Sequence, residues 1–206
     1  MNKVTKFIAV LSVALILVSA LGCNSGGKMQ SWKAPPTMQI DKTKNYTAVF
    51  DTNFGSFEIE LFAAAAPNTV NNFVFLARQG FYDDTVFHRI LKEFVIQGGD
   101  PGAGGPGYKF DDELSVLRPY EAGIVAMANA GANTNGSQFF ICTGYRSSSL
   151  DSIPNYTQFG RVISGMDVVL KIDAAPVAPI YDSQGNVEMS KPLNPPKINK
   201  VTIIES

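Results

Sequence analysis

Two segments of the chain carry side chains that could act on a bound ligand. The first contains Arg89 and Gln97, and the second contains Asn129 and Gln138. Each segment places strong hydrogen-bonding groups among apolar neighbours, and of the four side chains only Arg89 is charged. Amides and a guanidinium form directed hydrogen bonds, but they are poor nucleophiles and poor proton-transfer groups. The pattern therefore predicts a binding groove with fixed polar groups, and it does not favour acid–base or covalent chemistry.

The chain offers little else for catalysis or metal binding. His88 is the only histidine, so a metal cluster of the usual His and Cys kind cannot be assembled. A Ser-His-Asp triad remains arithmetically possible, but no G-x-S-x-G sequence supports it. Because His88 alternates with Arg89, it is expected to face away from the groove, as a hydrogen-bonded residue of the core or the barrel end. No metal and no cofactor are predicted.

Two loops lie beside these segments. Residues 102–107 match G-x-G-x-x-G by letter, yet Pro106 lacks a backbone N–H and no strand–helix unit frames the loop. A tight loop at the groove is therefore expected, and a dinucleotide site is not. Residues 133–137 are rich in turn formers and directly precede an apolar strand that opens with Gln138. They can present several donors to an extended peptide.

Periodicity predicts the elements that hold these segments. Residues 46–51 and 56–62 alternate apolar and polar side chains around Gly55, which indicates a β-hairpin with one buried face. Residues 198–205 alternate again and are expected to form a closing strand. Between residues 181 and 189, the sequence Gln-Gly-Asn indicates the tip of a further hairpin.

Two helices are expected. Pro67 opens the first and Gly80 closes it, with Asn71 and Asn72 off its apolar stripe. The second is expected over residues 162–173, and its buried side comprises Met166, Val169, Leu170 and Ile172. With no repeat and no second domain, the chain reads as one domain of many short strands and two helices, arranged as a closed barrel.

The N-terminal residues resemble an export signal. A basic start precedes an apolar run from Phe7 to Leu21, which is short for a spanning helix. Ala20-Leu21-Gly22-Cys23 resembles a bacterial lipobox, so residues 1–22 are predicted to be a signal peptide and Cys23 a lipidated N-terminus. The alternative is an uncleaved anchor helix. Both place the domain outside the cytoplasmic membrane, as a membrane-anchored protein.

Residues 23–44 are rich in Ser, Gly, Lys, Gln and Pro and are predicted to form a tether, followed by the folded domain at 45–206. Trp32, within the tether, is expected to pack back on the domain or to sit at the membrane.

With Cys23 lipidated, Cys142 has no disulfide partner and is expected to be a buried strand thiol. Removal of the leader lowers the formal net charge from −1 to −3 with the loss of two lysines. Nucleic-acid partners are therefore not expected.

Three sequence blocks closely resemble the cyclophilin-type peptidyl-prolyl cis-trans isomerases: FHRI with FVIQGGDP, then GGPGYKFDDE, then MANAGANTNGSQFFICT. The similarity runs from about Tyr46 to Ile204. It implies a mainly β fold, a closed eight-stranded antiparallel barrel capped by two α-helices, and isomerisation of X–Pro bonds in proline-containing polypeptides, without a cofactor. The resemblance assigns catalysis to Arg89 and Gln97. It assigns substrate binding to Phe94, Val95, Gly102, Ala128, Asn129, Ala130, Gln138, Phe140, Leu150 and Tyr156.

Departures from the family pattern gather on one wall of the groove. Tyr156 stands where many members carry a histidine, and it keeps a ring and a donor. Ser149 stands where a tryptophan supports cyclosporin binding in sensitive members, so weak or no binding of cyclosporin is predicted. The segment from Arg146 to Thr157 is also longer than usual.

These residues are compatible with three functions to different degrees. An isomerase that assists folding of extracytoplasmic polypeptides is favoured over a proline-peptide binding module or holdase, because a binder would not need a donor at the prolyl nitrogen. A membrane-tethered structural protein is disfavoured by the complete set of groove residues. A monomer is expected.

Overall fold

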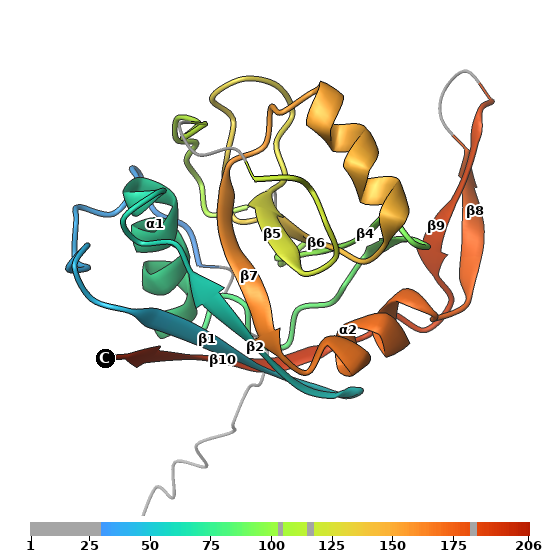
Figure 1. The fold of residues 1–206 in the computed structure, drawn as a ribbon, viewed down its shortest axis with the longest axis horizontal. Coiled ribbons are helices and arrows are strands. Elements are labelled where there is room, and N and C mark those ends of the chain that lie inside the picture. Colours follow the sequence, from blue (N-terminus) through green and yellow to red (C-terminus); the bar gives the residue numbers. More distant parts are fainter. Residues whose placement is uncertain (1–29, 103–104, 115–117, 182–184) are drawn as a thin grey trace, which may run out of the picture.

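The computed structural model describes residues 30–102, 105–114, 118–181 and 185–206. One antiparallel sheet of eight strands, in the order β10-β1-β2-β7-β5-β6-β4-β3, curls around the core (Figure 1). Its strands are β1 (Tyr46–Thr52), β2 (Gly55–Leu61), β3 (Arg89–Leu91), β4 (Val95–Gly98), β5 (Ile124–Met127), β6 (Phe139–Cys142), β7 (Gln158–Ser164) and β10 (Ile198–Glu205). The remaining elements are α1 (Pro67–Arg78), the 3₁₀ helix η1 (Tyr145–Ser152), α2 (Met166–Asp173) and a separate hairpin of β8 (Val177–Tyr181) and β9 (Val187–Pro192).

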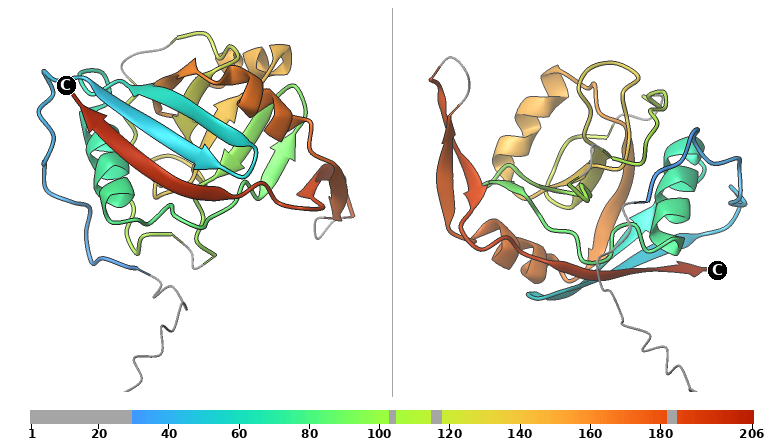
Figure 2. Two further views of the ribbon diagram at one scale, coloured as in Figure 1. Left: turned by 90° about the horizontal axis from the view of Figure 1, so that it is seen from below. Right: turned by 180° about the vertical axis from the view of Figure 1, so that it is seen from behind.

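The expected eight-stranded antiparallel sheet forms, and it curls into a half-barrel whose two edge strands are not paired along their length. Among the described residues, β3 and β10 share no ladder, and the seam between them is spanned just before both strands by a bridge of Val86 with Lys197. Backbone bonds from Phe87 to Pro196 and from Ile198 to Thr85 flank this bridge. The architecture is therefore a strongly curled sheet. Figure 2 shows β10, β1 and β2 running side by side.

The predicted first hairpin and closing strand are confirmed. β1 and β2 pair from Tyr46 with Leu61 to Thr52 with Gly55, and Gly55 has a φ of +118° in the turn. β1 also pairs with β10, whose bounds match the predicted 198–205. The further hairpin predicted near residues 181–189 is confirmed as β8 and β9, whereas the residues at its tip, 182–184, lie outside those described.

Two details of the predicted helices were wrong. α2 begins at Met166 instead of residue 162, because residues 158–164 form β7 between β2 and β5 and the chain turns at Gly165 with a φ of +75°. Leu170 is exposed, since a helix that starts at Met166 turns Val168, Val169 and Ile172 toward the core.

Asn71 and Asn72 of α1 are buried, although both are expected from the sequence to lie off the buried face. The side chain of Asn71 bonds to the backbone of residues 36–39, and that of Asn72 bonds to Tyr108 and Gly136. Segments from elsewhere in the chain lie over this side of the helix, which helical periodicity cannot reveal. These amides fasten α1 to its surroundings with satisfied hydrogen bonds.

The residues before β1 lie against the domain. The Trp32 ring stands 5.1 Å from that of Phe75, its backbone N–H donates to Pro106, and Ile40 is buried. The prediction that Trp32 packs back on the domain is confirmed. The predicted signal peptide and the predicted lipidation site at Cys23 fall within residues 1–29, which lie outside the described residues. Within the described residues, no helix has the length and apolar character needed to cross a membrane.

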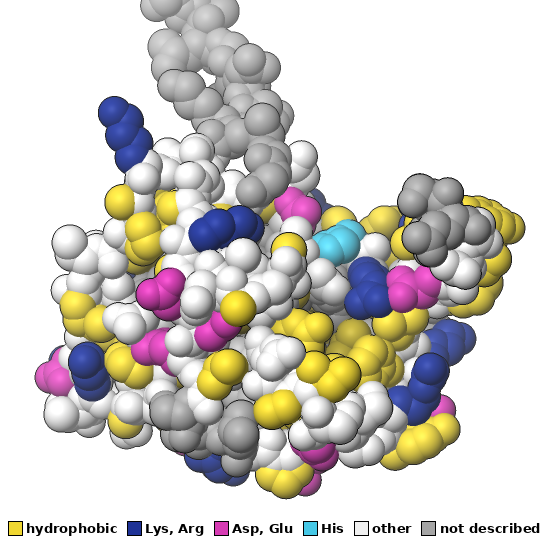
Figure 3. Space-filling view, turned by 90° about the horizontal axis from the view of Figure 1, so that it is seen from above, with side chains coloured by type: hydrophobic (Ala, Val, Ile, Leu, Met, Phe, Trp, Pro, Cys, Tyr) yellow, Lys and Arg dark blue, Asp and Glu magenta, His cyan; other side chains and the backbone are white. Residues whose placement is uncertain are grey.

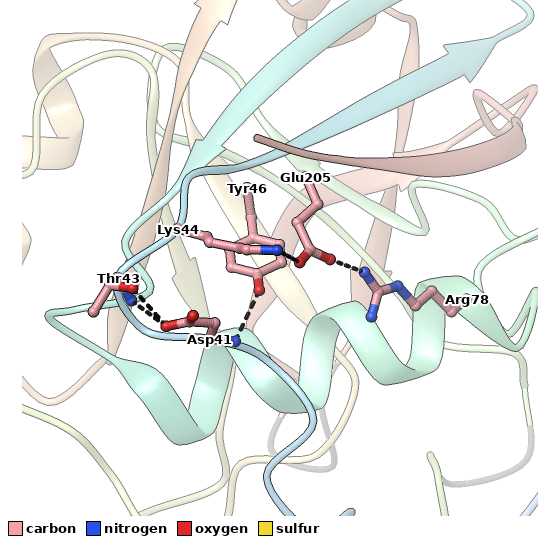
Figure 4. Close-up of polar contacts among 6 residues, drawn as sticks. All are labelled: Asp41, Thr43, Lys44, Tyr46, Arg78 and Glu205. Atoms are coloured by element: carbon pink, nitrogen blue, oxygen red, sulfur yellow. Dashed lines mark hydrogen bonds and ion pairs between the residues drawn. The ribbon is translucent and has the colours of Figure 1, made fainter.

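The two ends of the domain are tied together by a polar cluster (Figure 4). Lys44, just before β1, and Arg78, at the end of α1, both donate to Glu205 near the C-terminus, at 2.8 and 2.7 Å. The hydroxyl of Tyr46 accepts from the backbone of Asp41. These ion pairs are exposed to solvent, so each contributes little to stability.

Alternation along β6 separates the main core from a second apolar cluster. Phe139 and Ile141 enter the main core, where Phe139 lies edge-on to Phe73 at 5.9 Å. Phe140 and Cys142 point to the opposite face of the strand. That second cluster is the floor of the site described next.

Candidate active site

A row of side chains crosses three neighbouring strands. Arg89 on β3 is directly opposite Gln97 on β4, and Gln97 is directly opposite Phe140 on β6. Directly opposed residues in an antiparallel sheet share a face, so these three side chains must stand together. The strand alternation that was recognised in the sequence is what produces this row.

The row borders a small apolar pocket of about 150 Å³. Nine of the predicted site residues line it: Arg89, Phe94, Val95, Gln97, Ala128, Asn129, Phe140, Leu150 and Tyr156. The ring of Tyr156 stands edge-on to that of Phe140 at 5.4 Å, which closes one side. Figure 3 shows the outer surface in space-filling form, with hydrophobic side chains gathered in the middle of the face that is seen from above.

A chain of hydrogen bonds fixes the polar side of the site. Gln138 donates to Asp100 at 2.8 Å, Gln97 donates to Gln138 at 2.9 Å, and Arg89 Nη1 makes a long contact of 3.4 Å with Gln97 Oε1. The carboxylate of Asp100 can only accept hydrogen bonds and the guanidinium of Arg89 can only donate them. These two groups therefore determine the orientation of the amides of Gln138 and Gln97, which lie between them. Asp100 thereby orients the Gln97 oxygen toward Arg89.

A second hollow continues from the pocket on the far side of Gln97. Ala130 and Gln138 line it, and it shares Gln97, Ala128 and Asn129 with the pocket. The side chain of Asn129 is already engaged, donating to the Asn155 carbonyl at 2.9 Å. The backbone of Asn129 is therefore the group left to meet an extended ligand.

Gly102 is the one predicted site residue that lines neither the pocket nor the second hollow. It is exposed, and it lines a separate hollow beside Phe81 and Thr85. Its N–H donates to Asp100 Oδ1. Its connection to the site is thus through Asp100, and not through a shared wall.

The wall formed by residues 146–157 includes η1. Ser147 is buried and its hydroxyl donates to the Phe94 carbonyl, which holds η1 against the pocket. Ser149 is exposed and its hydroxyl bonds back to Arg146 within η1. Tyr120, outside the sequence prediction, supports this wall by donating to the Tyr156 carbonyl at 2.9 Å.

Sequence reasoning missed two acidic residues. Asp100 follows Gln97 in a near-consensus block, and its position beside the glycine pair was the available signal. Glu188, on β9, accepts from Arg89 Nε at 2.9 Å and from Nη2 at 2.6 Å. No local signal could have linked Glu188 to Arg89, because the two residues belong to separate sheets.

Titratable groups near the site are not arranged for acid–base work. Burial lowers the pKa of His88, and its Nδ1 is buried without a hydrogen-bond partner, so the expected hydrogen bond is not found at that atom. Burial raises the pKa of the Cys142 thiol to about 12. Within the described residues, no three His, Cys, Asp or Glu side chains converge as a metal site would require.

Comparison with known proteins gives a consistent result. Residues 47–203 match the family described as cyclophilin type peptidyl-prolyl cis-trans isomerase. The peptidyl-prolyl cis-trans isomerase-like 1 of Neurospora crassa is 50% identical over 133 residues, which cover 61% of this chain and 80% of that protein. The peptidyl-prolyl cis-trans isomerase-like 2 of Rhizopus delemar is 43% identical over 143 residues, which cover 66% of this chain but only 26% of that longer protein.

The fold has the same relatives. A crystal structure of a Cryptosporidium parvum cyclophilin type peptidyl-prolyl cis-trans isomerase superposes with a TM-score of 0.65 at 35% identity, covering 79% of this chain and 99% of that one. A second structure of that protein, in the presence of the dipeptide Ala-Pro, gives a TM-score of 0.64 at 35% identity and covers 78% of this chain and 99% of that one.

Proposed function

The chain belongs to the cyclophilin-type peptidyl-prolyl cis-trans isomerases, and we propose that it isomerises X–Pro bonds in polypeptides outside the cytoplasm and so assists their folding. One observation carries the proposed chemistry. Arg89 lines an apolar pocket while its Nη1 makes only a long contact with Gln97. A guanidinium donor is therefore available at the edge of a pocket suited to a proline ring.

The reaction needs a twisted amide to be favoured. Rotation about an X–Pro bond is slow, taking tens to hundreds of seconds, because twisting breaks amide resonance. In the twisted state the nitrogen lone pair is localised and can accept a hydrogen bond. Arg89 is always protonated and can donate a hydrogen bond to that nitrogen. This hydrogen bond is stronger in the twisted transition state than in the planar ground state.

The apolar pocket adds to this effect. A twisted amide is less dipolar than a planar one, so an apolar surface favours it relative to water. Phe94, Val95, Phe140 and Leu150 provide that surface around the proline ring. The isomerisation breaks no covalent bond and transfers no proton permanently. The residues of the groove therefore suffice for this step.

The substrate must also be held on one side while the other side rotates. The backbone of Asn129 and the oriented amides of Gln97 and Gln138 can anchor an extended chain through the second hollow. A protease-coupled assay on an Ala-Pro peptide tests the activity. Binding of the peptide without acceleration would identify a binding module instead of an isomerase.

Cyclosporin is expected to inhibit weakly. Ser149 is exposed on η1 and its hydroxyl is bonded to Arg146, so no ring is present there to contact the inhibitor. The Ser149→Trp variant is expected to lower the inhibition constant at least about tenfold, equivalent to about 1.4 kcal/mol. A titration of both proteins in the isomerase assay measures this. Low-nanomolar inhibition of the wild type would contradict the assignment of Ser149.

Membrane attachment is proposed to depend on Cys23. Its sequence context supports lipidation, and stable anchoring needs at least two lipid chains or an added signal, which a diacylglycerol group would satisfy. The Cys23→Ala variant is expected to move from the membrane to the soluble fraction. Cell fractionation with labelled fatty acid measures both localisation and modification.

Cys142→Ala is the matched control for this experiment. Cys142 is buried in β6, and its raised pKa keeps the thiol protonated and unreactive. This variant should remain lipidated and membrane-bound. Retention of Cys23→Ala at the membrane would indicate an uncleaved anchor helix instead.

The domain is proposed to act as a monomer.

A further inference from the structure

The guanidinium of Arg89 is held by a carboxylate that comes from outside the barrel. Arg89 Nε donates to one oxygen of Glu188 at 2.9 Å, and Nη2 donates to the other at 2.6 Å. Two parallel bonds to one carboxylate fix both the position and the plane of a guanidinium. The side chains of the pair are 33% and 41% exposed, so the contact is reached by solvent and contributes little to folding.

The supporting element is the hairpin of β8 and β9, which stands beside the barrel near β4 (Figures 1 and 2). β9 contacts β3, the strand that carries Arg89. On β9 the side chains alternate: Val187 and Met189 are exposed, whereas Glu188 between them is turned toward Arg89. The hairpin therefore presents one carboxylate to the site.

The geometry leaves the correct donor free. Glu188 occupies the edge of the guanidinium formed by Nε and Nη2, whereas Nη1 makes only the 3.4 Å contact with Gln97. Nη1 is therefore the guanidinium nitrogen without a short hydrogen bond, and it is the donor that we assign to the prolyl nitrogen. Arginine has many rotamers, and an arginine that is already oriented loses less freedom when it binds the transition state. The hydrogen bond from Arg89 holds the pKa of Glu188 below its usual range, so the carboxylate is ionised at neutral pH.

We propose that Glu188 is a positioning residue for isomerisation: it holds the Arg89 guanidinium so that Nη1 faces the proline pocket. This role rests on the proposed isomerase function. Glu188 acts through Arg89 and does not contact the substrate.

The test replaces Glu188 by glutamine, which keeps the size but removes the charge and one acceptor. Because orientation is lost while the apolar pocket is intact, kcat on an Ala-Pro peptide is expected to fall about three- to tenfold, with KM changing less than about twofold. In the Arg89→Ala background, Glu188→Gln is expected to have no further effect. NMR exchange measurements over a range of peptide concentrations give both constants.

Glu205→Gln is the matched control, because Glu205 also pairs with an arginine, Arg78 (Figure 4), and neither residue lines the pocket. Its kcat should equal that of the wild type. An unchanged or increased kcat in Glu188→Gln would overturn the proposal. An equal loss in the Arg89→Ala background would also overturn it, since Glu188 would then act independently of Arg89.

A readout that does not depend on activity separates this proposal from the proposed function. The Arg89 Nε–H signal in NMR spectra should exchange slowly with water in the wild type, and should shift and exchange faster in Glu188→Gln. An inactive wild type with this protected signal would refute the isomerase function but retain the pairing. A signal that is unaffected by Glu188→Gln would overturn the positioning role directly.

Discussion

Replacing Arg89 by alanine is expected to lower kcat/KM on an Ala-Pro peptide at least about tenfold, with the fold intact. Among the residues that the structure describes, Arg89 is the only charged one that lines the proline pocket, and its hydrogen bond is strongest when the prolyl nitrogen becomes basic. A tenfold loss corresponds to about 1.4 kcal/mol of transition-state stabilisation. Arg89 donates to a neutral nitrogen and not to an oxyanion. The loss of kcat/KM should therefore be smaller than when a donor to an oxyanion is removed.

Two further variants make this result specific. Arg89→Lys keeps the charge but lacks the planar fork that bonds to both oxygens of Glu188, so an intermediate rate is expected. Arg78→Ala removes an arginine whose partner, Glu205, lies outside the pocket lining, and it should keep the full rate. Urea denaturation verifies that the folds are equivalent. Wild-type turnover in Arg89→Ala would refute the role assigned to this residue.

Gly99→Ala is expected to destabilise the domain by about 3 kcal/mol. Gly99 has a φ of +82°, a conformation that costs an L-residue about 1 to 2 kcal/mol. An added Cβ would also approach the Ser137 carbonyl to 2.5 Å and the Phe139 ring to 2.9 Å, and such overpacking costs about 1 to 3 kcal/mol. The free energy of unfolding in urea measures the sum.

Gly185→Ala separates the two contributions. Gly185 has nearly the same φ, +83°, but an added Cβ there would meet no atom of the described residues within 4 Å. It should therefore cost only about 1 to 2 kcal/mol, through its backbone. Equal losses in the two variants would show that the close approach of Gly99 to β6 is unimportant. Gly99 lies between Gln97 and Asp100 in the chain, so a shift of its backbone would disturb both residues. Lower activity of Gly99→Ala is therefore also expected.

Much of the site could be predicted because it is built from strand alternation. Arg89, Gln97 and Phe140 each lie on the pocket side of a short strand whose opposite face enters the core, and that alternation is visible in the sequence. The resemblance to a family then supplied the roles. The pocket contains nine of the predicted residues, whereas Gly102 stands apart because its loop turns toward Phe81.

The missing parts depend on contacts between distant segments. The burial of Asn71 and Asn72 results from chain that crosses α1, and periodicity within the helix carries no sign of it. The start of α2 was wrong because β2 and β5 recruit residues 158–164 into β7. Glu188 was missed for the same reason. The sequence of the β8–β9 hairpin predicts that its two strands pair, but it does not predict that β9 lies beside β3.

The most direct test of the central claim is the cis–trans exchange rate of an Ala-Pro peptide, measured by NMR with and without catalytic amounts of the purified protein. Uncatalysed exchange takes tens to hundreds of seconds. We predict acceleration well above that rate by the wild type, and its loss in Arg89→Ala. Exchange at the uncatalysed rate in the presence of a folded, peptide-binding wild type would contradict the assignment of isomerase activity to this groove.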